Sequence, residues 1–127
     1  MGTKTPPIIL IVDDEPGVLE VTAEALADSG YELLLAGDAE TALALLRDNE
    51  VDLLLTDIVM PGDGGLALAD AAKQLRPGLR VVYTSGYIKT APFGSGASGG
   101  PSFGKLVNKP WRAERLRWAV AEALENP

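Results

Sequence analysis

Polar and charged residues stand at the ends of four short apolar runs in this 127-residue chain. They are Asp13 and Asp14 after residues 8–12, Asp57 after residues 52–56, Thr84 and Ser85 at the end of the run that begins at residue 79, and Lys109 after residues 105–107. Three carboxylates, two hydroxyls and an amine are suited to phosphoryl transfer onto a carboxylate, because that chemistry depends mainly on positioning and on neutralising charge.

A divalent cation would hold three converging carboxylates together, because groups of like charge repel one another. Mg²⁺ suits this set, since it binds through a few carboxylates, carbonyls and water, and it also attracts phosphate. The Lys109 amine and the Thr84 hydroxyl would then bind the phosphate oxygens. The nucleophile would be a carboxylate, and the product an aspartyl-phosphate.

Each of these residues also has a simpler structural role when it is taken alone. An Asp pair after a strand commonly caps a helix, a threonine is an ordinary strand residue, and a lone lysine is usually solvated. The prediction of a site therefore depends on the joint placement of these residues at the ends of several strands.

The apolar runs that precede these residues are predicted to be strands of a parallel sheet. Apolar runs that alternate with helix-period segments are typical of an α/β fold whose sheet is covered on both faces. Strands are expected at residues 8–12, 31–36, 52–56, 79–84 and 105–107, and helices from 16 to 30, from 38 onward, at about 64–75 and at about 111–125. In such a sheet ligands bind beyond the carboxyl ends of the strands, which is where the polar residues stand.

Composition excludes several kinds of chemistry. The chain has no cysteine and no histidine, which excludes disulfides, histidine-ligated zinc and a Ser-His-Asp triad. Its net charge is −7, and residues 1–72 carry 15 of the 18 acidic residues, so we expect no direct nucleic-acid binding. No apolar run approaches the roughly 20 residues that span a bilayer, so we expect a soluble, cytoplasmic protein with no membrane segment.

The chain is predicted to form one domain over residues 1–127, with its core at about 8–125. Glycine, serine and proline dominate residues 91–104, a composition that indicates a flexible segment.

The sequence resembles the receiver domains of two-component response regulators. The resemblance lies in Ile-Leu-Ile-Val-Asp13-Asp14-Glu15, Asp52-Leu-Leu-Leu-Thr-Asp57-Ile-Val-Met60-Pro61-Gly62, Val82-Tyr-Thr84-Ser85-Gly86-Tyr87 and Lys109-Pro110. It covers about residues 8–125 apart from the glycine-rich segment. The fold that it implies is a doubly wound, flavodoxin-like sheet of five parallel strands in the order 2-1-3-4-5, with helices on both faces.

The resemblance also implies a role for each site residue. Asp57 would accept the phosphoryl group. Mg²⁺ would be bound directly by Asp14, Asp57 and the backbone carbonyl of Val59, and mainly through water by Asp13. Thr84 would bind the phosphoryl group and move on activation, and Lys109 would pair with the phosphate.

The family further implies partners for the chain. The phosphodonor would be a sensor histidine kinase or a histidine phosphotransfer protein, and the signal would pass by conformational change and contact to a downstream protein target. The chain would not be an enzyme, and it would be either a stand-alone regulator or the receiver part of a larger protein, such as a hybrid kinase.

Three features bear on how such a domain would signal. Leu106 stands three residues before Lys109, where the family usually has Tyr or Phe. The segment 91–104 stands where the family has its fourth helix, which we expect to be short, displaced or disordered here. Trp118 falls nearly opposite the core stripe of the last helix, so it either anchors a partner or a homodimer, or packs against a neighbouring loop.

Other functions remain as alternatives. The main one is a receiver-like interaction module that is not phosphorylated, which the intact set of three acids, Thr84 and Lys109 disfavours. An aspartate-nucleophile phosphatase would need a second acid in an Asp-x-Asp after the first strand, which is missing. A flavin carrier would need a Ser/Thr/Gly phosphate loop there, and the acids at 13–15 would repel the phosphate.

Overall fold

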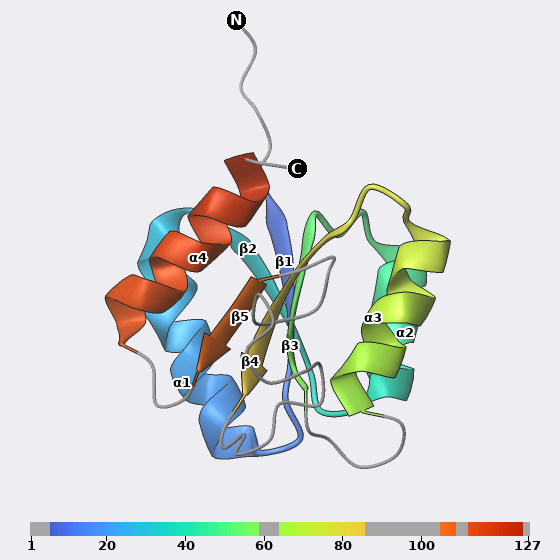
Figure 1. Ribbon diagram of the computed structural model, residues 1–127, viewed down its shortest axis with the longest axis horizontal. Coiled ribbons are helices and arrows are strands. Elements are labelled where there is room, and N and C mark those ends of the chain that lie inside the picture. Colours follow the sequence, from blue (N-terminus) through green and yellow to red (C-terminus); the bar gives the residue numbers. More distant parts are fainter. Residues whose placement is uncertain (1–5, 59–63, 86–104, 109–111, 126–127) are drawn as a thin grey trace, which may run out of the picture.

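The computed structural model describes residues 6–58, 64–85, 105–108 and 112–125. Its elements, shown in Figure 1, are β1 (Ile8–Val12), α1 (Pro16–Leu26), a 3-10 turn (Ala27–Ser29), β2 (Glu32–Ala36), α2 (Ala39–Asp48), β3 (Leu53–Asp57), α3 (Gly64–Leu75), β4 (Arg80–Ser85), β5 (Lys105–Asn108) and α4 (Ala113–Glu125). The label α4 is used for the last helix, Ala113–Glu125. The helix expected between β4 and β5, together with the segment 91–104, falls outside the described residues.

The five strands form one parallel sheet in the order β2-β1-β3-β4-β5, which confirms the predicted α/β fold and strand order. β2, β3 and β4 each begin one residue later than expected. Two pairs of register partners lie at the carboxyl edge of the sheet: Val12 of β1 lies beside Thr56 of β3, and Asp57 of β3 lies beside Thr84 of β4.

Local sequence explains where several elements begin and end. Pro16 occupies the first turn of α1, where its missing N–H costs nothing. Gly30 follows the 3-10 turn in the left-handed conformation, with φ at 84°, which glycine adopts without a steric penalty. Asp38 caps α2, since its carboxylate accepts the Thr41 N–H at 2.7 Å. That bond from the Thr41 backbone holds the pKa of Asp38 below its usual value.

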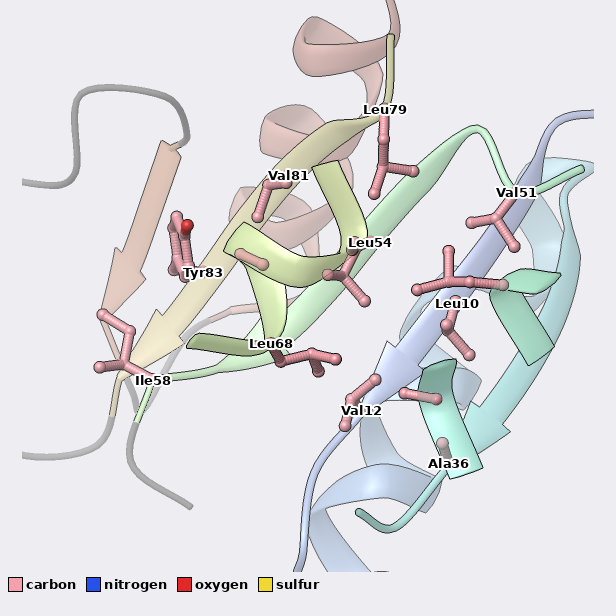
Figure 2. Close-up of a cluster of buried hydrophobic side chains, with 14 residues drawn as sticks. Leu10, Val12, Ala36, Val51, Leu54, Ile58, Leu68, Leu79, Val81 and Tyr83 are labelled. Carbon is pink, nitrogen blue, oxygen red and sulfur yellow. The ribbon is translucent and has the colours of Figure 1, made fainter. Parts of the chain in front are cut away.

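Helices cover both faces of the sheet (Figure 1), and a hydrophobic cluster fills each side. Under α2 and α3 the cluster includes Leu10, Leu54, Leu68, Val81 and Tyr83 (Figure 2). Under α1 and α4 it includes Ile9, Ile11, Leu53, Leu55, Val82 and Leu116. Burial raises the pKa of Tyr83, and the charge of Asp70 adds to the effect, so this phenol stays protonated in the core. Among the described residues, no helix has the length and apolar character that a membrane crossing needs.

Arg76, just after α3, ties this helix to the end of α2. Its guanidinium donates hydrogen bonds to the carbonyl oxygens of Leu46, at 3.2 Å, and of Asn49. Carbonyls at the end of a helix have no partner within that helix, so Arg76 satisfies groups that would otherwise require water.

Arg76→Ala is expected to lower the free energy of unfolding by roughly 2–3 kcal/mol, because two charge-assisted hydrogen bonds are lost. Urea unfolding followed by circular dichroism measures this loss. Lys73→Ala is the matched control, since Lys73 donates one hydrogen bond, to the Leu79 carbonyl at 2.9 Å. An equal or smaller loss for Arg76→Ala than for the control would contradict the assigned role.

Candidate functional site

Three carboxylates from two strands meet at the carboxyl edge of the sheet. Asp13 and Asp14 follow β1, and Asp57 ends β3. One carboxylate oxygen from each of the three lies within 4.8 Å of the other two. Asp13 and Asp57 are buried, at 3% and 7% exposure, whereas Asp14 is exposed. The cluster is therefore enclosed on one side and open to solvent through Asp14.

Alternation along the strands explains why these side chains converge. Leu53 and Leu55 pack in the cluster under α1 and α4, so Asp57, two residues further along, belongs to the same face. Ile9 and Ile11 of β1 pack in the same cluster, so Asp13, two residues after Ile11, belongs to that face as well. The sheet thus brings together residues that are 43 or 44 positions apart in the sequence.

Backbone hydrogen bonds fix the loop that holds the first two acids. The Asp13 N–H donates to the Ala36 carbonyl at 3.2 Å, which extends the β1–β2 ladder by one residue. The Glu15 N–H donates to Asp13 Oδ1 at 3.0 Å. The Asp13 carboxylate thus orients the turn into α1 and also belongs to the acidic cluster.

Thr84 lies next to Asp57 in the sheet, as the sequence predicted. The two are register partners, Thr84 is 4% exposed, and its carbonyl accepts the Ile58 N–H at 2.9 Å. Val82 packs under α1 and α4, so Thr84 shares the face of Asp57. Its hydroxyl is therefore on the side where a group attached to Asp57 would lie.

Two of the predicted site residues cannot be compared with the structure. Lys109 and the Val59 carbonyl lie outside the described residues, and their roles remain predictions. The described part of the site therefore consists of Asp13, Asp14, Asp57 and Thr84.

Gly65 is a site residue that the sequence reasoning missed. It is the second residue of α3, and its N–H donates to the Ile58 carbonyl at 2.8 Å. A Cβ atom on Gly65 would lie 1.9 Å from the Asp57 carbonyl oxygen. The start of α3 can therefore rest against the backbone of Asp57 only because residue 65 has no side chain. The adjacent pair Gly64-Gly65 at the predicted helix start was the available signal.

The donor set fits a hard divalent cation such as Mg²⁺. All three side chains offer carboxylate oxygens, and Mg²⁺ is typically held by one or two carboxylates together with several waters. The exposed Asp14 leaves the open side on which such waters would be needed. The described residues could thus bind a metal ion. Softer metals would prefer the sulfur of cysteine or the nitrogen of histidine as ligands, and this chain contains neither residue.

Mg²⁺ is expected to raise the thermal unfolding midpoint, because it binds the folded cluster and relieves the repulsion among its carboxylates. Two unit charges 4.8 Å apart, the upper limit of the separations in this cluster, repel by about 3 kcal/mol at an effective dielectric constant of about 20. Since Asp14 is exposed, solvent screens part of this energy. Asp14→Asn should therefore stabilise the metal-free protein by about 1 kcal/mol and reduce its response to Mg²⁺.

Differential scanning fluorimetry with EDTA and with an Mg²⁺ titration measures both effects. Asp28→Asn is the control, because Asp28 is exposed in the turn after α1 and lies outside the cluster. An Mg²⁺ response of Asp14→Asn as large as that of the control would contradict a role for Asp14 at the cation.

The sequence of the chain is similar to those of known regulatory proteins. The chain matches the model of the response regulator receiver domain over residues 9–121. It is 38% identical over 121 residues to the nitrogen assimilation regulatory protein NtrX of Azorhizobium caulinodans, a match that covers 92% of this chain and 26% of that protein. It is 30% identical over 108 residues to the response regulator receiver protein CpdR of Brucella abortus, a match that covers 85% of this chain and 88% of CpdR.

The fold has close counterparts among solved structures. The receiver domain of NtrX from Brucella abortus superposes with a TM-score of 0.79 and 37% sequence identity, over 94% of this chain and 99% of that domain. The chain spans about a quarter of the length of the NtrX protein that it matches.

Proposed function

Because the chain belongs to the receiver domains of two-component response regulators, we propose that it accepts a phosphoryl group on Asp57 in the presence of Mg²⁺. The observation that carries the proposal is the gathering of Asp13, Asp14 and Asp57 within 4.8 Å at the carboxyl edge of the sheet. A module that served only for contact would not need three acids at this distance, because their repulsion costs stability.

In the proposed reaction, a carboxylate oxygen of Asp57 forms a bond to phosphorus while the bond from phosphorus to the donor breaks. With a phosphohistidine donor, the imidazole leaves with the electron pair of the P–N bond and takes up a proton. When bound, Mg²⁺ would neutralise charge on the transferring oxygens. Asp14, Asp57 and the Val59 carbonyl would hold it directly, and Asp13 would hold it through water.

Thr84 and Lys109 would receive the phosphoryl group once it is on Asp57. The Thr84 hydroxyl can donate a hydrogen bond to a phosphoryl oxygen, and the Lys109 ammonium would balance its charge. A hydroxyl that turns toward the new phosphate changes the packing at the end of β4. That movement is the proposed first step of the signal, and the chain would carry out no enzymatic turnover of its own.

The proposed partners follow from this chemistry. The donor would be a sensor histidine kinase or a histidine phosphotransfer protein, and the output would be contact with a downstream protein in the cytoplasm. The net charge of −7 favours a protein target over nucleic acid.

Incubation with acetyl phosphate and Mg²⁺, followed by intact mass spectrometry, tests phosphate acceptance. We expect the mass to rise by one phosphoryl group, and the gain to disappear in EDTA or after hydroxylamine, which cleaves acyl phosphates. No gain in mass with Mg²⁺ would overturn the proposal and favour the non-phosphorylating interaction module.

A further inference from the structure

Exposed apolar side chains of the described residues gather on one side of the sheet. Of the four large ones, Val21 on α1 is 55% exposed, Trp118 on α4 is 51% exposed and Leu35 on β2 is 44% exposed. α1 and α4 lie side by side over one face of the sheet (Figure 1). Leu33 of β2 packs in the cluster under these helices, so Leu35, two residues further along the strand, belongs to the same face. Only Leu75, on α3, belongs to the opposite side.

The two helices on this side carry opposite charge where Val21 and Trp118 are exposed. On α1 and the turn after it, the exposed charged residues are all acidic, namely Glu20, Glu24 and Asp28. On the first half of α4, arginines outnumber acids, and the exposed charged residues are Glu114, Arg115 and Arg117, with Arg112 just before the helix. The Arg115 guanidinium lies 5.2 Å from the centre of the Trp118 ring, a cation–π arrangement that keeps an arginine beside the aromatic surface.

The exposed apolar residues also occupy corresponding positions when each helix is counted from its first residue. Both helices run antiparallel to the strands and begin at the carboxyl edge of the sheet (Figure 1). Val21 is the sixth residue of α1 and Trp118 is the sixth residue of α4. Glu20 and Arg115 each stand within one turn of these residues, on the side nearer the helix start.

We propose that two copies of the chain associate through this α1/α4 face, with α1 of each copy against α4 of the other. A two-fold axis parallel to the helices brings α1 opposite the partner's α4 twice. In this arrangement α1, with Val21 and Glu20, faces the partner's α4, with Trp118 and Arg115. A second copy is the occupant that the surface favours, because the exposed acids of α1 and the arginines in the first half of α4 complement each other and are both present on the same face.

The size of the surface sets the expected strength. Helices of 11 and 13 residues are about 16 and 20 Å long, so the contact lies at the small end of specific interfaces, and we expect a weak, concentration-dependent association. The net charge of −7 per chain opposes association at long range. At 0.15 M salt that repulsion is screened beyond about 8 Å, so the close pairs decide the outcome.

Sedimentation velocity of the intact chain over a range of concentrations tests the association. Trp118→Ala should weaken it at least about tenfold, because aromatic anchors at the centre of an interface carry much of its energy. Leu75→Ala is the control, since Leu75 is exposed on the other side of the sheet and should leave association unchanged. A chain that stays monomeric at millimolar concentration, or equal effects of the two variants, would overturn the proposal.

Charge reversal tests the pairing of the two helices. Arg115→Glu and Glu20→Arg should each prevent self-association, whereas a mixture of the two variants should associate, because the mixed pair restores attraction at both contacts. A merely structural effect of either substitution would not be relieved by mixing. Failure of the mixture to associate, with the wild type dimeric, would overturn the assigned orientation.

The absence of cysteine from the chain allows a direct test of the geometry. Val21→Cys and Trp118→Cys, each made alone and then mixed under mild oxidation, should give disulfide-linked dimers mainly in the mixture. Faster cross-linking of either variant with itself would show α1 against α1, or α4 against α4, and would overturn the arrangement. This outcome is independent of phosphate acceptance, since it requires neither Mg²⁺ nor a phosphodonor.

Discussion

Asp57→Asn is expected to abolish the gain of a phosphoryl group from acetyl phosphate in the presence of Mg²⁺. An amide has the shape of the carboxylate but is a far weaker nucleophile, and it removes one of the three charges that would hold the cation. Asp57 is 7% exposed and is the register partner of Thr84, whereas Asp13 and Asp14 follow a different strand. Intact mass spectrometry measures the loss as the disappearance of the phosphorylated species over the full time course.

Matched variants separate the loss of the nucleophile from other effects. Asp48→Asn changes an exposed acid at the end of α2 and should leave the gain in mass intact. Thr84→Ala should slow the gain without preventing it, because the carboxylate remains. Circular dichroism should show Asp57→Asn folded, and more stable without metal, as one repelling charge is gone. Phosphorylation of Asp57→Asn at the wild-type rate would remove Asp57 from the proposed role.

The fold and the described part of the site follow from patterns that are local in sequence. Apolar runs ending in acids at Asp13 and Asp57 predict parallel strands, and the carboxyl ends of parallel strands meet at one edge. The convergence of Asp13, Asp14, Asp57 and Thr84 could therefore be predicted before any coordinates were known. Strand starts shifted by one residue because hydrogen-bond pairing with a neighbouring strand, such as Arg80 N–H to the Asp52 carbonyl at 3.3 Å, sets them.

Other features depend on approaches between distant segments, which no local pattern encodes. Arg76 satisfies the end of a helix some 30 residues earlier, and nothing around residue 76 identifies those carbonyls as its acceptors. The outward direction of Trp118 follows from helical periodicity. That the exposed acids of α1 and the arginines of α4 share one face of the molecule becomes apparent only when the fold sets the two helices side by side.

Gly65→Ala is expected to destabilise the protein by about 2 kcal/mol or more, although alanine favours helix formation. The change gains up to about 1 kcal/mol of helix propensity and unfolded-state entropy. Against this, the new Cβ would lie 1.9 Å from the Asp57 carbonyl oxygen and 3.0 Å from Ile58 Cα. Both are backbone atoms that no rotamer change can move, so α3 must retreat from β3 and lose the hydrogen bond from Gly65 N–H to the Ile58 carbonyl.

Gly17→Ala is the matched control for this prediction, because Gly17 is also the second residue of a helix at the same edge of the sheet. A Cβ on Gly17 would meet no atom within 4 Å, so only the gain in propensity remains and the protein should become slightly more stable. Urea unfolding measures both variants. The movement of α3 expected in Gly65→Ala should also affect phosphate acceptance, since a shift of about 1 Å in a reacting group can lower a reaction rate about 100-fold. Gly65→Ala should therefore accept phosphate more slowly even under conditions where it is fully folded, whereas Gly17→Ala should not. Equal stability of the two variants would show that α3 moves freely away from Asp57, and that Gly65 does not hold the end of β3 in place.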